Sequence, residues 1–297
     1  MKLVLAGVSG FLGTAWRDHL AREGHEVVRL VRGEALSASE SSWDPYAGRV
    51  DRALIESADV VGTLSGAPLE HWPLTESYKR TFLASRVAPT RTLAEAVAAS
   101  DRKPALVAQN GVSGYGDRGD ARLTEDADFG ADTFMGGVTR AWQEATTPAV
   151  EAGARVAVMR SGVILDRRGG ALKPLLLLFR SGLGGPVGSG EQYFPTISMT
   201  DWVRAATHLA AREDASGVYN LSGPEPTTNA EFGRRLGRML HRPSVVPVPA
   251  WPIRRLGGDI LRDLLLSSVR VEPARLLDEG FAFEHPTLDQ RLAAALT

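Results

Sequence analysis

A short apolar run that stops at a glycine is the feature that most constrains this chain. Residues 3–6 are Leu-Val-Leu-Ala, and Gly7, Gly10 and Gly13 then follow at three-residue steps before a helical pattern begins. This order indicates a strand, a tight turn and the N-terminus of a helix. Such a turn lets the backbone approach a pyrophosphate, and the helix end offers N–H groups and a positive dipole. The spacing is GxxGxxG rather than GxGxxG, and a glycine-rich turn without a ligand is the alternative.

The end of the second predicted strand, at residues 26–31, bears on the choice of cofactor. NAD-binding folds commonly place Asp or Glu there, about 20 residues after the turn, to bind the ribose hydroxyls. Here Val31 is followed by Arg32. No carboxylate repels a 2′-phosphate at this place, and a guanidinium can bind one. The sequence therefore favours NADP over NAD, with a solvated loop cation as the alternative for Arg32.

Composition narrows the class of protein. The chain has 297 residues, of which 43% are hydrophobic and 23% charged, with a net charge of −1 and no cysteine. These values fit an ordinary globular protein, and they make nucleic acid and anionic membranes poor candidate partners. Disulfides, cysteine nucleophiles and thiolate metal sites are excluded. The first residues resemble a strand rather than a signal peptide, so we expect a cytoplasmic protein, and we allow for a homodimer.

Strands alternate with helices along the chain, which predicts an α/β fold with a doubly wound parallel sheet of the Rossmann type. Strands are expected at 2–6, 26–31, 60–65, 105–110, 155–161 and 217–221, and helices at 11–23, 77–100, 139–152 and 202–212. Pro89 predicts a kink or break in the second helix. We expect a dinucleotide-binding core at 1–165, completed by about 195–225. A glycine-rich segment at 166–194 and a small appended module at 243–297 follow.

Several longer motifs carry a resemblance to a known family. They are Trp43-Asp44-Pro45, Leu64-Ser65-Gly66-Ala67-Pro68, Ser85-Arg86, residues 116–120 (GDRGD), 160–165 (RSGVIL), 170–172 (GAL), 182–190 (GLGGPVGSG), 241–243 (HRP) and 248–250 (VPA). With the glycine turn, they resemble the extended short-chain dehydrogenase/reductases, and within them the atypical epimerase family proteins that end in a DUF1731 module. The resemblance covers almost the whole chain. It implies a Rossmann fold, binding of NADP or NAD, and a substrate-side location for the glycine-rich segment. That location suggests a mobile lid or a phosphate-binding loop, and a flexible surface loop is the alternative.

The expected cofactor contacts come from three places in the chain. They are Gly7, Ser9, Gly10, Phe11, Leu12 and Gly13 in the first turn and helix, Arg32 after the second strand, and Leu64, Ser65, Gly66, Ala67 and Arg86. Small residues at 64–67 let the chain pass beside the adenosine and phosphates, although a plain tight turn is the alternative. Trp43 and Asp44 are candidates for stacking on the adenine and for accepting a proton from its amino group.

The catalytic residues depart from the usual pattern of short-chain dehydrogenases, which pair a Tyr with a Lys one helical turn later. No tyrosine here has Lys four residues on, and Met135 and Thr139 align with the pair. Tyr115 is predicted to donate a proton and Asn110 to orient a substrate oxygen. The alternatives are a structural loop tyrosine and a strand-end cap.

Two functions remain open at this point. The first is an NADP-dependent oxidoreductase or epimerase-like enzyme that acts on a small polar substrate by hydride transfer. The second is a non-catalytic NADP-binding sensor or interaction protein, which the missing Tyr–Lys pair supports. The histidines lack metal-binding spacing, and the acidic residues between 117 and 128 resemble a solvated surface, so no metal site is predicted.

Overall fold

The computed structural model describes residues 1–68, 75–256 and 258–297. They divide into two compact units. The first comprises Met1–Asn110, Ala141–Met159 and Ala206–Val218, and the second comprises Gly111–Arg140, Arg160–Ala205 and Tyr219–Thr297. The predicted division at 165, 194 and 243 follows sequence modules rather than spatial contacts, and it stays a prediction.

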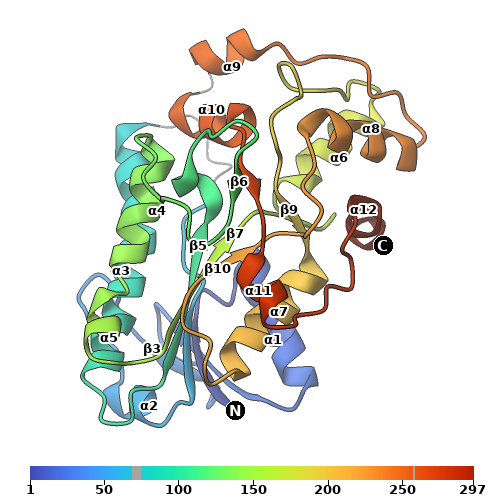
Figure 1. Cartoon of the computed structure of the whole chain (residues 1–297). Helices are drawn as coiled ribbons and strands as arrows, with labels where there is room; N and C mark the ends of the chain where they lie inside the picture. Colours follow the sequence, from blue (N-terminus) through green and yellow to red (C-terminus); the bar gives the residue numbers. More distant parts are fainter. Residues whose placement is uncertain (69–74, 257) are drawn as a thin grey trace. The chain divides into compact units, whose positions relative to one another are not determined.

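A seven-stranded sheet confirms the predicted doubly wound α/β fold (Figure 1). Its order is β10 (Gly217–Leu221), β7 (Val156–Ser161), β5 (Ala105–Gly111), β4 (Val60–Thr63), β1 (Lys2–Ala6), β2 (Glu26–Val31) and β3 (Glu40–Ser42). The pairs β1–β2, β2–β3, β1–β4 and β4–β5 are parallel. The chain runs outward from β1 to β3 and then continues on the other side of β1 with β4. Open sheets bind ligands at the carboxyl ends of the strands beside such a reversal.

The apolar runs explain most of the sheet. In β1 residues 3–6 are buried, and all four residues of β4 are buried, as expected for parallel strands covered on both faces. The strand β3 was not predicted, because its sequence Glu-Ser-Ser shows no apolar pattern. This edge strand pairs with β2, and Arg29 and Glu40 form an ion pair at 2.7 Å across the two strands.

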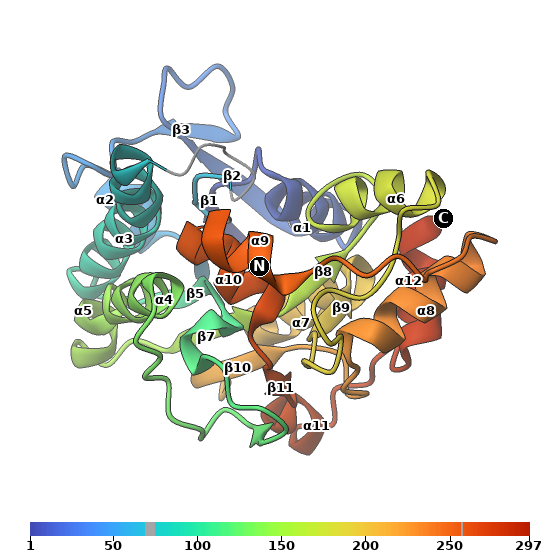
Figure 2. The same ribbon diagram turned by 90° about the horizontal axis from the view of Figure 1, so that it is seen from above.

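Helices cover both faces of the sheet within the first unit. Figures 1 and 2 show α1 (Phe11–Arg22) on one side of β1 and β2, and α3 (Glu76–Ala98) with α2 (Arg52–Glu56) on the other. The helix α3 continues through Pro89 without a break, and the other expectation at this residue, a kink, stays a prediction. Leu93 and Val97 on this helix are fully buried, and that packing offsets the hydrogen bond that proline cannot donate.

The helix predicted at 139–152 is instead two helices, α4 (Phe134–Glu144) and α5 (Thr147–Glu151). Pro148 occupies the first turn of α5, where its missing N–H group costs nothing. The predicted helix at 202–212 is α7 (Met199–Ala211). The helix with uninterrupted apolar periodicity was therefore predicted as a single element, whereas the stretch that contains Pro148 was not.

The second unit contains short strands and several helices. Two small parallel sheets pair β8 (Val163–Leu165) with β9 (Thr196–Ser198), and β6 (Arg122–Leu123) with β11 (Arg270–Val271). Its helices include α6 (Leu172–Arg180), α8 (Asn229–Met239), α9 (Ala250–Leu256), α10 (Gly258–Leu266), α11 (Ala274–Asp278) and α12 (Leu288–Leu296), with a 3-10 turn η1 at Val112–Tyr115. Leu176 of α6, Leu236 of α8 and Leu292 of α12 share one buried apolar cluster.

Among the residues described, no helix combines the length and apolar character needed to cross a lipid bilayer. The cytoplasmic location stays a prediction.

Candidate cofactor-binding site

The three glycines of the first turn have different physical roles. Gly7 has a φ of +79°, and a Cβ on it would stand 2.6 Å from the backbone of Leu64 and Ser65. A Cβ on Gly13 would stand 2.4 Å from the Gly7 carbonyl oxygen. The fold itself therefore requires Gly7 and Gly13. Gly10 is exposed, has an ordinary φ of −80° and caps the N-terminus of α1. A Cβ on Gly10 would stand 3.3 Å from the Gly7 carbonyl oxygen, a tight contact but a much less severe one than those at Gly7 and Gly13.

A cleft of about 570 Å³ begins at this turn. It is lined by residues 7–10, 29–33 and 64–68, by Trp43, Pro45 and Tyr46, and by Thr81, Ser85 and Pro89 of α3. The predicted contacts Gly7, Ser9, Gly10, Arg32 and Leu64, Ser65, Gly66 and Ala67 all line it. Phe11, Leu12, Gly13 and Arg86 are not among the lining residues. The cleft thus combines a helix N-terminus, a glycine turn and a cation in one unit, which suits a dinucleotide.

The cleft adjoins a second cavity of about 930 Å³, since Arg32, Gly33, Trp43, Pro45 and Tyr46 line both. Three guanidinium groups lie along them. Arg29 pairs with Glu40, and Arg49 pairs with Asp44 at 2.9 Å. Arg32 is exposed and forms no ion pair with any residue of the described ranges. Its positive charge is therefore available to an anion.

Arg86 contacts the backbone of the turn at 64–67, which lines the cleft. Its side chain is buried, and Nη2 donates a hydrogen bond to the carbonyl oxygen of Ala67 at 3.1 Å. Its guanidinium stacks on the Phe82 ring at 3.5 Å, and burial lowers the pKa of Arg86 to about 10. Ser85 Oγ accepts a hydrogen bond from the Ala67 N–H group at 2.8 Å. These contacts fix the turn at 64–67, so Arg86 positions the backbone that lines the cleft.

Tyr115 lies in a polar network inside the second unit. Its side chain is fully buried, and its hydroxyl donates to Asn220 Oδ1 at 2.8 Å and accepts from Arg160 Nη1 at 2.9 Å. Burial raises the pKa of the Tyr115 hydroxyl, which keeps it protonated at neutral pH. Phe129 packs edge-on against its ring. This environment favours the structural alternative, although the predicted role as a proton donor stays a prediction.

The other positions expected near the reaction carry little proton-transfer chemistry. Asn110 is buried and ends the first chain segment of the first unit, and its backbone oxygen accepts a hydrogen bond from Gln109 Nε2 at 2.6 Å. Met135 and Thr139 are both buried, and the Thr139 hydroxyl donates to the Met135 carbonyl oxygen at 3.0 Å. Neither Met135 nor Thr139 can replace the Tyr–Lys pair. The orienting role of Asn110 stays a prediction.

The glycine-rich segment borders a third cavity, of about 410 Å³, within the second unit. Gly188 and Tyr193 from this part of the chain line it together with Asp120 and Arg254. The segment is tied to the residues before α9: the Val248 N–H group donates to the Pro186 oxygen, and the Gly188 N–H group donates to the Val248 oxygen, both at 2.9 Å. A cavity of this size, lined by both polar and apolar groups, suits a small molecule.

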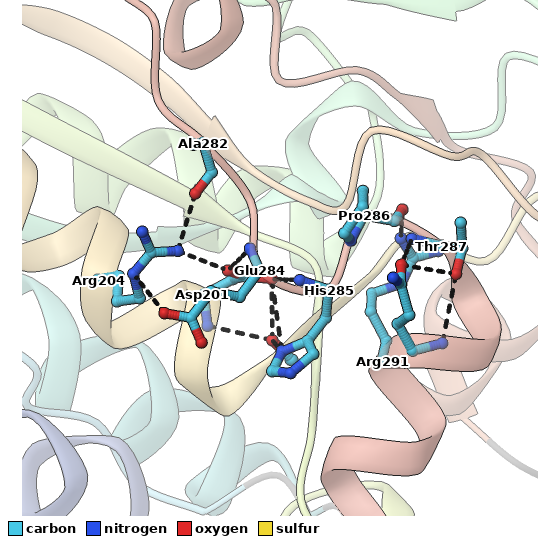
Figure 3. Close-up of polar contacts among 10 residues, drawn as sticks. Asp201, Arg204, Ala282, Glu284, His285, Pro286, Thr287 and Arg291 are labelled. Carbon is cyan, nitrogen blue, oxygen red and sulfur yellow. Dashed lines mark hydrogen bonds and ion pairs between the residues drawn. The ribbon is translucent and has the colours of Figure 1, made fainter.

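A buried polar cluster around Asp201 was not predicted from the sequence (Figure 3). Asp201 is fully buried, and its carboxylate accepts from the backbone N–H groups of Glu284 at 2.8 Å and His285 at 2.9 Å. Ser198 Oγ lies 3.1 Å from Asp201 Oδ2 and 3.0 Å from His285 Nδ1. The spacing Ser-x-x-Asp at 198–201 was a usable signal for a helix cap, but nothing in the sequence pointed to residues 284 and 285 as partners.

Comparison with known proteins places this geometry in a family. Residues 3–136 match the NAD dependent epimerase/dehydratase family, and residues 248–295 match DUF1731, a domain of unknown function. An epimerase family protein of Mycobacterium bovis is 35% identical over 99% of this chain and 97% of its own. The human epimerase family protein SDR39U1 is 33% identical over 98% of both chains. This chain is an epimerase family protein.

The crystal structure of human SDR39U1 with NADPH matches this epimerase family protein over 100% of both chains. The two have a TM-score of 0.88 and 32% sequence identity. The resemblance in sequence and the Rossmann-type fold are therefore confirmed.

Proposed function

We propose that this epimerase family protein binds NADP(H) in the cleft between the glycine turn and Arg32, and that it uses the cofactor for hydride transfer with a small polar substrate. The observation that carries the proposal is the lining of the cleft. The exposed Gly10 lies at a helix N-terminus. Arg32 lies directly after the second strand, where it can bind the 2′-phosphate of the cofactor. The crystallised human relative holds NADPH. Bound NADPH would supply a hydride to a carbonyl carbon.

Arg32→Ala tests the choice of cofactor. We expect this variant to bind NADPH about tenfold or more weakly, because a hydrogen bond to a charged group typically contributes about 1.5–3 kcal/mol. Affinity for NADH should stay unchanged, since NADH lacks the 2′-phosphate. Isothermal titration calorimetry with both nucleotides measures the two effects. Arg91→Ala, an exposed arginine on α3 outside the cleft lining, is the matched control. Equal loss for NADPH and NADH would refute a 2′-phosphate contact.

We further propose that the substrate binds at the third cavity, beside the glycine-rich segment. Asp120, Glu191 and Arg254 line this cavity with Tyr193, Gln192 and Ser189, and such groups hydrogen-bond polar substituents. A panel of aldehydes and ketones, with NADPH oxidation followed by absorbance, tests whether the protein is an enzyme. Oxidation with any member supports the oxidoreductase function.

Two observations favour the non-catalytic alternative. The hydroxyl of Tyr115 already has partners on both sides, and Met135 and Thr139 stand at the positions of the usual pair. Tight NADPH binding without oxidation across the whole panel would favour a sensor or interaction protein over an enzyme.

Tyr115→Phe separates a structural from a catalytic role for this tyrosine. We expect the variant to lower the free energy of unfolding by about 1–2 kcal/mol, because Arg160 and Asn220 each lose a buried partner. Turnover of the folded variant on any substrate from the panel should stay near that of the wild type. If turnover instead falls by about 10²–10⁴-fold while the unfolding free energy is unchanged, Tyr115 is a general acid.

A further inference from the structure

A small hairpin lines the cofactor cleft and the adjoining cavity. Asp44 and Arg49 pair through two backbone hydrogen bonds of 2.9 Å, and Gly48 makes the turn with a φ of +65°. The Asp44 carboxylate accepts from the N–H groups of Tyr46 and Ala47, each at 3.1 Å. Its second oxygen accepts from Arg49. Both oxygens of the Asp44 carboxylate therefore accept hydrogen bonds from within the hairpin, and the positive charge of Arg49 offsets its negative charge.

The hairpin is also anchored to the body of the first unit. Thr92 of α3 donates a hydrogen bond through Oγ1 to the carbonyl oxygen of Pro45 at 2.9 Å. Thr92 is buried, so this contact is shielded from water. Pro45 has a fixed φ and precedes Tyr46 directly. The backbone that carries Tyr46 is thus held on both sides before any ligand arrives, which lowers the entropy cost of binding.

Two aromatic side chains lie in this part of the cleft, and they differ in what they can offer. Trp43 lines both cavities, but it is only 7% exposed and packs in the apolar cluster with Val28 and Leu30. Its ring is used in the core. Tyr46 is 56% exposed and lines both the cleft and the adjoining cavity. A large aromatic ring that is exposed on a rigid loop is a surface on which a flat ligand can stack.

We propose that Tyr46, rather than Trp43, is the platform on which the adenine ring stacks. This inference rests on the proposed nucleotide site, because the order of groups along the cleft carries it. With the pyrophosphate at Gly7–Gly10 and the 2′-phosphate at Arg32, the adenosine end lies beside the residues shared by the two cavities. Tyr46 is among them. Stacking of a base on an aromatic ring uses the π-face alone, so it needs no polar contact from Asp44.

If the adenine stacks on Tyr46, this side chain contributes to the affinity for every ligand that contains adenine, whether or not the ligand carries a 2′-phosphate. Base stacking on an aromatic side chain typically corresponds to about a tenfold change in affinity or more. Tyr46→Ala should therefore weaken NADPH, NADH and ADP by the same factor of about ten. Tyr46→Phe should bind all three as the wild type does, since the ring is kept. Affinity for nicotinamide mononucleotide, which lacks adenine, should be equal in all variants.

Calorimetric titration of the full-length protein with these four probes tests the idea. Val150→Ala removes another exposed hydrophobic side chain in the same unit and serves as the matched control. Melting temperatures of the variants check that the hairpin stays folded. Unchanged affinity for NADH and ADP in Tyr46→Ala would overturn the platform. A loss confined to NADPH would also overturn it, because that pattern marks a phosphate contact through the hydroxyl.

Failure of the proposed cofactor site gives a different result. If the wild type binds ADP and NADH but shows no preference for NADPH, the proposed role of Arg32 fails while Tyr46→Ala still reports on stacking. If the wild type binds none of the adenine nucleotides, both proposals are refuted together.

Discussion

Gly10→Val should weaken NADPH binding by at least about a hundredfold while the protein keeps its fold. A β-branched side chain at this position would fill the space in which phosphate oxygens approach the N–H groups of α1. We expect the fold to accommodate the change after a small local shift, because Gly10 has an ordinary φ and an added Cβ would make one tight contact, 3.3 Å from the Gly7 oxygen. Valine is a poorer N-cap than glycine, so a loss of about 1 kcal/mol in stability is expected. Circular dichroism and calorimetric titration measure the two effects separately.

The neighbouring glycines provide the contrast that makes this result interpretable. An alanine at Gly7 or Gly13 would press its Cβ to within 2.6 Å or 2.4 Å of backbone atoms, so those variants should misfold or melt much earlier. Gly10→Ala adds a single methyl group and should reduce affinity less than Gly10→Val does. If Gly10→Val were folded and bound NADPH like the wild type, the glycine turn could not be the cofactor site.

The first unit could be predicted from sequence largely because its signals are local. The strands at 2–6 and 26–31 match the structure. The first is a buried apolar run, and the second has Val and Leu at its two buried positions. Counting from the turn then places Arg32 directly after β2. The edge strand β3 escaped prediction, because its residues are polar and its pairing with β2 depends on contacts outside its own sequence.

The candidate site shows where sequence reasoning ends. Trp43 and Tyr46 are both aromatic and only three residues apart, and no pattern says which ring is buried. The hairpin at 44–49 decides this by turning Trp43 into the core and leaving Tyr46 exposed. Tyr115 was likewise predicted to be a proton donor from its position after a strand. Its hydroxyl bonds to Asn220, 105 residues later, so only the structure reveals its burial network.

Asp201→Ala should lower the stability of the second unit by about 3–5 kcal/mol. Removal of the fully buried Asp201 carboxylate takes the shared acceptor away from several donors at once, and such a loss is costly. The donors here are the N–H groups of Glu284 and His285, the Ser198 hydroxyl and Arg204 Nη1 at 3.2 Å (Figure 3). Urea unfolding followed by tryptophan fluorescence reports the loss, because Trp202 is fully buried one residue away.

Two further variants show whether the carboxylate itself matters. Glu284→Ala removes a half-exposed partner of Arg204 at 3.0 Å and should cost less than about 1 kcal/mol, as exposed ion pairs do. Asp201→Asn keeps the shape but turns an amide group toward N–H donors, so most of the loss in Asp201→Ala should persist. In both Asp201 variants, the backbone amides of Glu284 and His285 should exchange hydrogen faster than in the wild type. In Glu284→Ala, the amide of His285 should exchange at the wild-type rate. Wild-type stability in Asp201→Ala would mean that the segment at 282–287 is held by its apolar contacts instead.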